Sequence, residues 1–372
     1  MHSNLPATVG TPLEDVVTPC LLLDLDAFEH NLDHMAQFVR DNNISLRAHA
    51  KCHKSADIAR ELARRGAIGI CCQKVSEAEA LHHAGVSNIL VSNQVVNPVM
   101  INRMAAMAVT AEVSVCVDDL DNLGHIQDAA ARHDATIGVL VEIDCGANRC
   151  GVAPGAAAVP LAQKAAASPN LKFLGLQAYQ GAAQHKYDYA EREALVAKAA
   201  QMIRQTTAEL EKVGLKCEVI AGGGTGTFRL DTATGLYTEL ECGSYMFMDA
   251  DYGRVKEKDG AFISEFRNSL FIYTTVMSKT KPHRAICDAG LKAQSVDSGM
   301  PVIHGRSDVE YIAAADEHGV ISDPDNKLRL GDRLKLIPSH CDPTVNVYDW
   351  YVGVRGGRVE QVFPVTARGM NL

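Results

Sequence analysis

The stretch SLRAHAKCHKSADIARELARRGAIGICCQKVSEAEALHHAGVSNILVSN (45–93) sets the pattern of the fold. Short apolar runs at 45–50, 68–73 and 88–93 predict strands, and the polar or alanine-rich segments between them, such as 76–85, predict helices. Strands that alternate with helices are typical of a parallel sheet, because two parallel strands need a long crossover between them.

The same alternation continues to residue 245. Further strands are predicted at 113–118, 138–144, 171–179, 217–223 and 237–245, and two long helices at 118–134 and 188–214. Eight strand–helix units in roughly 200 residues fit a (β/α)8 TIM barrel near its lower size limit. We therefore expect an α/β fold built on such a barrel.

Towards the C-terminal end the pattern changes. Short alternating runs separated by turns, among them NSLFIYTTVMS (268–278), LRLGDRLKLIPSH (328–340) and WYVGVRGG (350–357), predict an antiparallel β domain. LLLDL (21–25) and a predicted helix at 26–41 precede the first barrel strand, so the N-terminal segment is expected to join this second domain. The expected division is a barrel of residues 26–262 and a β domain of residues 1–25 and 263–372.

The charge and composition of the chain limit the kinds of molecule that it is expected to bind. The 372 residues are 47% hydrophobic and 22% charged, and 36 basic against 45 acidic residues give a net charge of −9. Nucleic acids and anionic membranes need a basic surface, so neither is an expected partner. A small anionic ligand remains compatible, because the local field of a cleft can oppose the global charge.

The cysteines and the N-terminus indicate a cellular compartment. The N-terminus has no basic segment followed by an apolar core, and no later apolar stretch is long enough to span a bilayer. The 11 cysteines are scattered through apolar segments such as GICCQ, which favours buried reduced thiols over disulfides. We expect a cytoplasmic protein.

Polar residues follow the predicted barrel strands, where a barrel enzyme builds its site. In chain order these are Lys51, Gln73, Asn93, Asp118, Arg149, Tyr179, Gly222 to Thr225, Ser244 and Tyr245. The segments GGGTGT (222–227) and CGSY (242–245) follow the seventh and eighth strands, a common place for phosphate in such barrels. The glycine run also fits a plain turn, and a dinucleotide fingerprint fails because Thr227 occupies its last glycine position.

Each of these side chains has a bland and a functional interpretation. Lys51, in RAHAKCHKS (47–55), is either a solvated lysine or an amine made less basic by burial and nearby cations, and so a better nucleophile for an aldehyde. His49 is either a core histidine or a polar neighbour of that amine. Arg149 fits a surface residue or a ligand contact, and Tyr179 a core aromatic or a phenol that faces a ligand.

The segment PSHCDPT (338–344) is a candidate metal site. If it continues a strand, His340 and Asp342 point to one face and Cys341 to the other. Nitrogen and oxygen ligands on one face favour a hard ion such as Mg²⁺ or Mn²⁺ over zinc, although His-x-Asp also arises by chance.

Read together, these segments resemble a known enzyme family. The chain is similar to the fold-type III pyridoxal-phosphate (PLP) enzymes of the D-threonine aldolase and D-serine dehydratase group. The resemblance runs nearly end to end, through TPCLLLDLDAFEHN (18–31), RAHAKCHKS (47–55), EIDCGANRCGV (142–152), GGGTGTF (222–228), ELECGSYMFMDADYG (239–253), DAGLKAQSVDSG (288–299) and PSHCDPT (338–344). Within the family, KAQSVDSG (292–299) and HCDPTVNVYDWYVGVR (340–355) look most like aldolases that act on β-hydroxyaspartate.

The resemblance implies a role for each matching residue. The fold would be an alanine-racemase-like barrel with a β domain, working as a homodimer. Lys51 would carry PLP covalently, Arg149 would contact its phenolate oxygen, Tyr179 its pyridine nitrogen, and Gln73 would also line the cofactor site. The phosphate would be held by Gly223, Gly224, Thr225, Ser244 and Tyr245.

The remaining implied roles concern the metal and the substrate. His340 and Asp342 would bind Mn²⁺ or Mg²⁺ rather than Zn²⁺, and His185 would be a base near the β-hydroxyl group. Further residues expected to line the substrate are Arg254, Lys292, Gln294, Asp316 and His318.

The implied reaction is cleavage of a D-configured β-hydroxy-α-amino acid to glycine and an aldehyde. The first alternative is a PLP- and metal-dependent D-serine or D-3-hydroxyaspartate dehydratase, but such relatives tend to carry cysteine where this chain has Asp342. A non-catalytic PLP carrier and a racemase would both leave the His340 and Asp342 pair unexplained.

Overall fold

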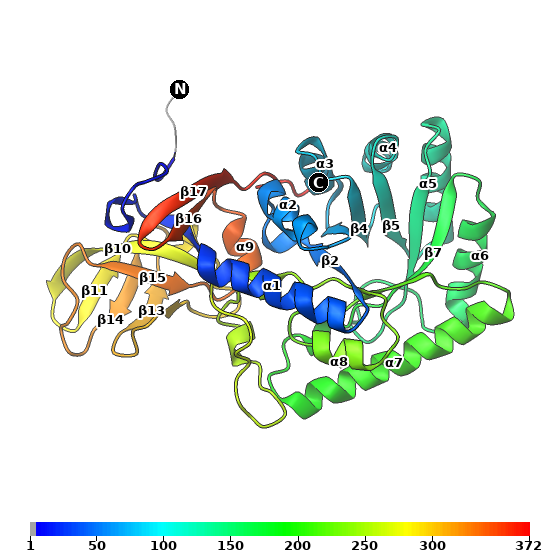
Figure 1. Cartoon of the computed structure of the whole chain (residues 1–372). Helices are drawn as coiled ribbons and strands as arrows, with labels where there is room; N and C mark the ends of the chain where they lie inside the picture. The colour runs from blue at the N-terminus through cyan, green and yellow to red at the C-terminus, as the bar shows by residue number, and fades with distance from the viewer. Residues whose placement is uncertain (1–4) are drawn as a thin grey trace.

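The eight apolar runs predicted as barrel strands all form strands, because each is bounded by turn residues and buried among neighbouring elements. In the computed structural model, which describes residues 5–372, these strands pair in parallel and close on themselves through Ser45 and Glu239. The predicted TIM barrel is therefore confirmed (Figure 1). The barrel strands are β2 (Ser45–His49), β3 (Gly69–Cys72), β4 (Asn88–Gln94), β5 (Glu112–Val117), β6 (Ile137–Glu142), β7 (Leu171–Gln177), β8 (Val219–Gly222) and β9 (Glu239–Leu240).

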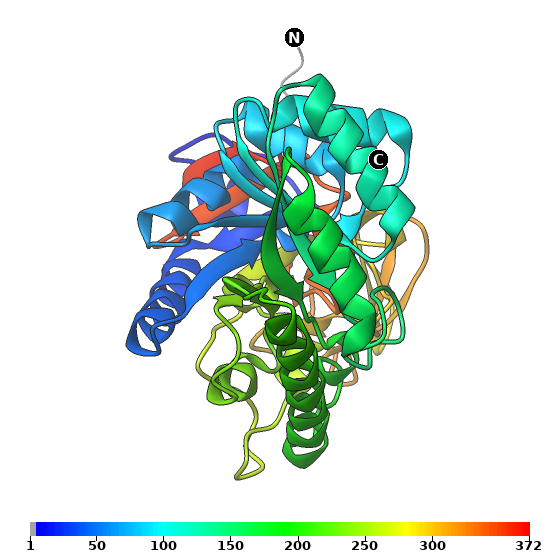
Figure 2. The same cartoon turned by 90° about the vertical axis from the view of Figure 1, so that its right-hand side faces the viewer.

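Helices surround the barrel strands, as the view from the barrel end shows in cyan and green (Figure 2). They are α2 (Ala56–Arg64), α3 (Val75–His83), α4 (Pro98–Met107), α5 (Leu120–Arg132), α6 (Val159–Ala167), α7 (Tyr189–Lys212) and α8 (Phe228–Ala233). The main core lies between these helices and the strands, and a small cluster that includes Cys71, Leu90 and Cys116 fills the barrel interior. The barrel is thus a packed scaffold, with room for a ligand at its mouth.

A second sheet stands beside the barrel. Within residues 5–372 it has nine strands, of which seven follow the order β13-β14-β11-β10-β1-β16-β17, while β15 pairs with β10 and β12. The strands are β1 (Cys20–Asp24), β10 (Leu270–Lys281), β11 (Arg284–Cys287), β12 (Val302–Ile303), β13 (Glu310–Ala314), β14 (Gly319–Ser322), β15 (Arg333–Ile337), β16 (Trp350–Arg355) and β17 (Arg358–Pro364). β1 lies inside the sheet, antiparallel to β10 and parallel to β16.

The N-terminal strand therefore pairs with C-terminal strands, as expected for residues before the barrel. Helix α1 (Leu25–Asp41) follows it, capped by the Asp24 side chain, and buries one face against both the barrel and the β domain (Figure 1). The division of the chain at residues 25 and 262 stays a prediction.

Two expected strands are wrong in extent. The eighth barrel strand ends at Leu240, and residues Ser244–Met246 form a 3-10 helix. The chain turns inward there because Gly243 lies against the first barrel strand, where an added Cβ would be 3.0 Å from the His49 carbonyl oxygen.

The segment PSHCDPT does not continue strand β15, which ends at Ile337. Pro338 has no N–H group to donate to a sheet. The chain then enters the short helix α9 (Cys341–Val345), with His340 as its N-cap residue. The N–H of Cys341 donates to Oδ2 of Asp249 at 3.0 Å, which ties this turn to the barrel domain.

Two predicted properties of the whole chain can be compared with the structure. Across residues 5–372, no helix is both long and apolar enough to cross a membrane. All eleven cysteines lie in this range as free thiols, and most are buried, as expected.

Candidate active site

A cavity opens at the carboxyl ends of the barrel strands. Its volume of about 170 Å³ is roughly ten times what one water molecule needs, so it admits a small organic ligand. Residues from seven of the barrel strands and their following loops meet here, as the barrel architecture predicts. The lining consists of His49, Lys51, Cys52, Gln73, Ser92, Arg149, Gln177, Tyr179, Gly223, Gly224, Thr225, Glu241, Gly243, Ser244 and Tyr252.

Lys51 follows β2 and reaches into this cavity. Its Nζ lies 3.1 Å from Oδ2 of Asp342, and this carboxylate raises the pKa of Lys51 above its ordinary value. The functional interpretation of Lys51 assumed a less basic amine, whereas the contact with Asp342 makes this amine more basic. The sequence suggested cationic neighbours for Lys51, but α9 of the β domain brings a carboxylate to it.

His49 supports the turn that carries Lys51. Its Nδ1 accepts the N–H of Lys51 at 3.3 Å, and its Nε2 lies 3.0 Å from the side-chain amide of Gln73. Burial, and then the charge of Lys51, lower the pKa of His49 well below its ordinary range. A neutral imidazole thus fixes Lys51 and Gln73 relative to each other.

Arg149 and Tyr179 meet on one side of the cavity. The guanidinium carbon of Arg149 lies 5.8 Å from the centre of the Tyr179 ring, a cation–π contact. The turn that carries Arg149 is held because Asp118 accepts the N–H of Gly151 at 3.0 Å. Asp118, which the sequence placed at a strand end, thus shapes the loop.

The two loops after β8 and β9 touch each other, which supports the expected anion site. Oγ1 of Thr225 accepts the N–H of Tyr245 at 3.0 Å, and Ser244 lines the cavity beside them. Gly223 has a φ of +76°, a conformation that side chains rarely adopt, and an added Cβ would lie 3.1 Å from the Asp231 carboxylate. The Tyr245 side chain is buried in the core, so its backbone contributes here.

His340 and Asp342 lie together although the premise of a shared strand face was wrong. His340 Nε2 is 3.9 Å from Oδ1 of Asp342, and this oxygen is buried without a hydrogen-bond partner among residues 5–372. Two ligands about 2.1 Å from one ion can stand up to about 4.2 Å apart, so the spacing permits a shared ion. No group of three or more such ligands occurs within residues 5–372.

His185 belongs to a separate polar cluster formed with residues after β9. Its Nδ1 lies 2.8 Å from Oδ2 of Asp251, whose other oxygen accepts from Tyr187 and from Arg254 at 2.6 Å each. Burial opposes ionisation of Asp251, but the hydrogen bonds of His185 and Tyr187 outweigh it and lower the pKa of Asp251 to about 2. The bond to Asp251 in turn raises the pKa of His185, and the charge of Lys51 opposes that rise. The residue expected as a base is thus oriented and made more basic.

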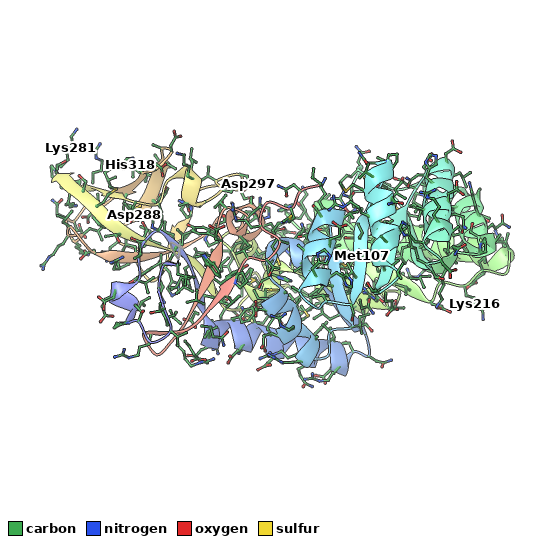
Figure 3. All side chains as sticks on the ribbon, turned by 90° about the horizontal axis from the view of Figure 1, so that it is seen from above. Met107, Lys216, Lys281, Asp288, Asp297 and His318 are labelled. Carbon is green, nitrogen blue, oxygen red and sulfur yellow. The ribbon has the colours of Figure 1, made fainter. Side chains whose placement is uncertain are left out.

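The residues expected to line the substrate are largely elsewhere. Lys292 is exposed and paired with Glu317, Gln294 is buried in the β domain, and Asp316 and His318 are exposed. Figure 3 shows His318 toward the outer end of the β domain, near Lys281, and Asp297 between it and the barrel. These four positions are not part of the cavity lining.

Several polar residues at this mouth were not predicted from the sequence. Gln177 donates to Glu241 at 2.7 Å in the cavity floor, and burial raises the pKa of Glu241 to about 7. Gln177 and Glu241 stand at the ends of β7 and β9, and this position could have identified them. Asp251 and Asp297, which contact the two histidines, do not stand directly at a strand end and gave no such signal.

Comparison with known proteins places this arrangement in context. Residues 23–251 match the model of the alanine racemase N-terminal domain, and residues 269–354 that of a putative serine dehydratase domain. The chain is 50% identical to the 3-hydroxy-D-aspartate aldolase of Paracoccus denitrificans (strain Pd 1222), over 98% of this chain and 96% of that protein. The solved structure of the D-threonine aldolase from Filomicrobium marinum is 46% identical and superposes with a TM-score of 0.96, over 99% of this chain and 100% of that one.

A dehydratase relative is more distant. The D-threo-3-hydroxyaspartate dehydratase of Delftia sp. (strain HT23) is 24% identical over 88% of this chain and 91% of that protein.

Proposed function

This chain belongs to the family of alanine-racemase-like enzymes that contains 3-hydroxy-D-aspartate aldolase and D-threonine aldolase, and on that premise we propose that it is a PLP- and divalent-metal-dependent lyase. It cleaves the Cα–Cβ bond of a D-configured β-hydroxy-α-amino acid and releases glycine and an aldehyde. The observation that carries the proposal is the meeting of Lys51 with Asp342 at the barrel mouth, 3.1 Å apart, because it joins a candidate cofactor lysine to a candidate metal ligand.

The donor set of the cavity fits PLP. PLP carries an aldehyde, a phenolate and a phosphate. The amine of Lys51 matches the aldehyde and the guanidinium of Arg149 matches the phenolate. The glycine turn with Thr225 matches the phosphate. Gln73, Tyr179, Gly223, Gly224, Ser244 and the backbone of Tyr245 complete the proposed cofactor site. When bound, PLP supplies an electron sink for the carbanion that cleavage leaves at Cα.

The unpartnered Oδ1 of Asp342, judged among residues 5–372, fits a divalent ion shared with His340. When bound, such an ion supplies a Lewis acid that makes a hydroxyl proton easier to remove. A nitrogen and a carboxylate oxygen favour Mn²⁺ or Mg²⁺ over Zn²⁺.

His185 is the proposed base for the β-hydroxyl proton. Its Nδ1 is engaged by Asp251, so Nε2 is the nitrogen left to accept that proton. Asp251 is almost fully buried and its pKa is low, so it stays ionised and stabilises the imidazolium that forms. Arg149 adds a fixed positive charge near the ring of Tyr179, where it favours an anionic oxygen.

Product analysis tests this function against β-elimination. The holoenzyme with Mn²⁺ is given D-threonine and D-3-hydroxyaspartate in parallel, and glycine plus acetaldehyde or glyoxylate is the expected result. Ammonia with a keto acid would move the protein to the dehydratase branch. Lys51→Ala is expected to lose turnover and covalently bound PLP, with Lys74→Ala, a change at an exposed lysine outside the cavity, as the control. Full turnover by Lys51→Ala would overturn the proposal.

The cellular setting is also proposed. Eleven free and mostly buried thiols support a reducing compartment, the cytoplasm. A homodimer is the proposed assembly. The exposed Lys292, Asp316 and His318 at the β-domain surface would then be free to face a second copy.

A further inference from the structure

The two ring nitrogens of His340 face two different carboxylates. Nδ1 lies 2.8 Å from Oδ2 of Asp297, a hydrogen-bonding distance. Nε2 lies 3.9 Å from Oδ1 of Asp342, the oxygen that is buried and unpartnered within residues 5–372. One nitrogen is thus engaged by Asp297, and the other faces the atom that lacks a partner.

Asp297 is held in place by its neighbours. Its Oδ1 accepts the hydroxyl of Ser295 at 2.6 Å, and its Oδ2 accepts the hydroxyl of Ser298 at 3.3 Å. Because each oxygen of the carboxylate has a local donor, the group is oriented before any ion arrives. Figure 3 shows Asp297 on the side of the β domain that is nearer to the barrel.

The segment that carries Asp297 is joined to the segment that carries His340. Ser339 donates its hydroxyl to the carbonyl of Ser295 at 3.1 Å, and the N–H of Ser295 donates to Oγ1 of Thr344 at 3.2 Å. Thr344 also donates its hydroxyl to the carbonyl of His340 at 2.8 Å. These bonds keep the Asp297 carboxylate and the His340 ring in a fixed relation.

The same segment is tied to the barrel mouth. Arg254 donates to the carbonyl of Ser298 at 3.1 Å and to Oδ1 of Asp251 at 2.6 Å. Arg254 thereby links Asp251, which orients His185, to Ser298, the neighbour of Asp297. Arg254, for which a substrate contact stays a prediction, thus links these two clusters.

From this geometry we propose that Asp297 is a positioning residue for the divalent ion. It accepts the N–H of His340 Nδ1, fixes the plane of the ring and leaves Nε2 free to bind the ion beside Asp342. Histidine ligands of metals commonly use their second nitrogen in this way, and loss of the partner weakens metal binding about 10- to 100-fold. The inference rests on the proposed function, because that function requires an ion at His340 and Asp342.

The competing explanation is a plain surface ion pair. The side chain of Asp297 is 47% exposed, and exposed pairs contribute little to stability. A surface pair predicts that the affinity for the ion is independent of Asp297, whereas a positioning role predicts that it is not. The affinity therefore separates the two explanations, and it is measured without turnover.

The test is a titration of PLP-loaded wild type and variants with Mn²⁺, followed through the electron paramagnetic resonance signal of the free ion. We expect Asp297→Ala to raise the Kd for Mn²⁺ about 10- to 100-fold. Asp297→Asn is expected to raise it about threefold, because a neutral acceptor keeps the hydrogen bond at roughly half its strength. Asp325→Ala, which removes an exposed carboxylate elsewhere in the β domain, is expected to leave the Kd unchanged.

His340→Ala distinguishes failure of the inference from failure of the proposed function. If this variant loses Mn²⁺ while Asp297→Ala binds it within twofold of wild type, the positioning role is overturned and the metal site stands. If His340→Ala itself binds Mn²⁺ as wild type does, the metal site and the inference both fall. The isosteric Asp297→Asn keeps the test decisive should the alanine variant not fold, since an unchanged Kd there also overturns the role.

Discussion

The ammonium nitrogen of Lys51 lies 3.1 Å from Oδ2 of Asp342. The proposed cofactor lysine and a proposed metal ligand therefore form an ion pair. Burial raises the pKa of Asp342, but the charges of Lys51 and His340 and the hydrogen bond from Lys51 together outweigh it and keep that pKa below its ordinary value. An ion that binds Asp342 has to compete with this ammonium.

The first prediction is that PLP and Mn²⁺ strengthen each other's binding. Once Lys51 carries the cofactor, it no longer offers a free ammonium to Asp342, so the carboxylate becomes available to the ion. We expect the Kd for Mn²⁺ to fall about tenfold on loading with PLP, and the Kd for PLP to fall by the same factor in Mn²⁺, because binding linkage is reciprocal. Calorimetric titration of apoprotein and holoprotein measures both. Equal Mn²⁺ affinities would contradict the competition.

The second prediction concerns the acid limb of the pH profile. The hydrogen bond to Asp251 raises the pKa of His185, and a base works in its neutral form, so kcat/KM should rise with pH through this raised pKa. Asp251→Asn removes the charge that stabilises the imidazolium, so the limb should move to lower pH and the plateau should fall about 10-fold or more.

Initial rates across pH check this shift. Glu193→Gln, which removes a carboxylate from the exposed face of α7, serves as the matched control and should leave the limb in place. If the acid limb of the kcat/KM profile lies at the same pH in Asp251→Asn as in wild type, His185 is not the base.

A third prediction follows from ligand chemistry at position 342. Asp342→Cys keeps the nitrogen ligand of His340 but replaces a hard oxygen by a soft thiolate, which prefers zinc. The ratio of Zn²⁺ affinity to Mn²⁺ affinity should rise by about tenfold or more. Competition dialysis of the PLP-loaded variant with both ions gives this ratio. If the ratio is unchanged, residue 342 is not a ligand.

The fourth prediction links stability to pH through Asp231, which contacts the loop after β8. Burial raises the pKa of this carboxyl from 3.8 to about 7, so the folded protein holds a proton that the unfolded chain releases. Its contribution to stability is complete below pH 3.8 and is lost progressively as the pH rises to about 7. Asp231→Asn removes this dependence while it keeps an oxygen acceptor for Thr227.

Urea denaturation at several pH values is the measurement. The free energy of unfolding of wild type, relative to Asp231→Asn, should fall between pH 4 and pH 7 and then level off. A difference that is constant with pH would mean that Asp231 is ionised throughout.

The fold was predictable because its signals are local. Each barrel strand is a short apolar run next to a helical segment, and β-to-α alternation allows few topologies. The strand-end rule then found Lys51, Gln73, Arg149 and Tyr179 for the cavity without any contact information. His340 and Asp342 were found on the wrong premise of a shared strand, and they converge because a helix turn brings them together.

Contacts between segments that are far apart in the sequence could not be predicted from any sequence pattern. Asp251 meets His185 across 66 residues, and Asp297 meets His340 across 43. The roles expected for Lys292, Gln294, Asp316 and His318 stay predictions. No sequence pattern shows which loops of the β domain reach the mouth, because the orientation of this domain against the barrel decides it. That orientation arises from packing of α1 and the buried residues around it.

The place of β1 has a consequence for how the protein is made. Leu21, Leu22 and Leu23 are translated before the barrel, but their partners on β16, Tyr351 to Gly353, are translated after it. The whole barrel is synthesised while this apolar strand has no partner strands to pair with. The nascent chain is therefore exposed to aggregation and to chaperone capture until β16 has been translated, and loss of either strand leaves the other without its pairing partner.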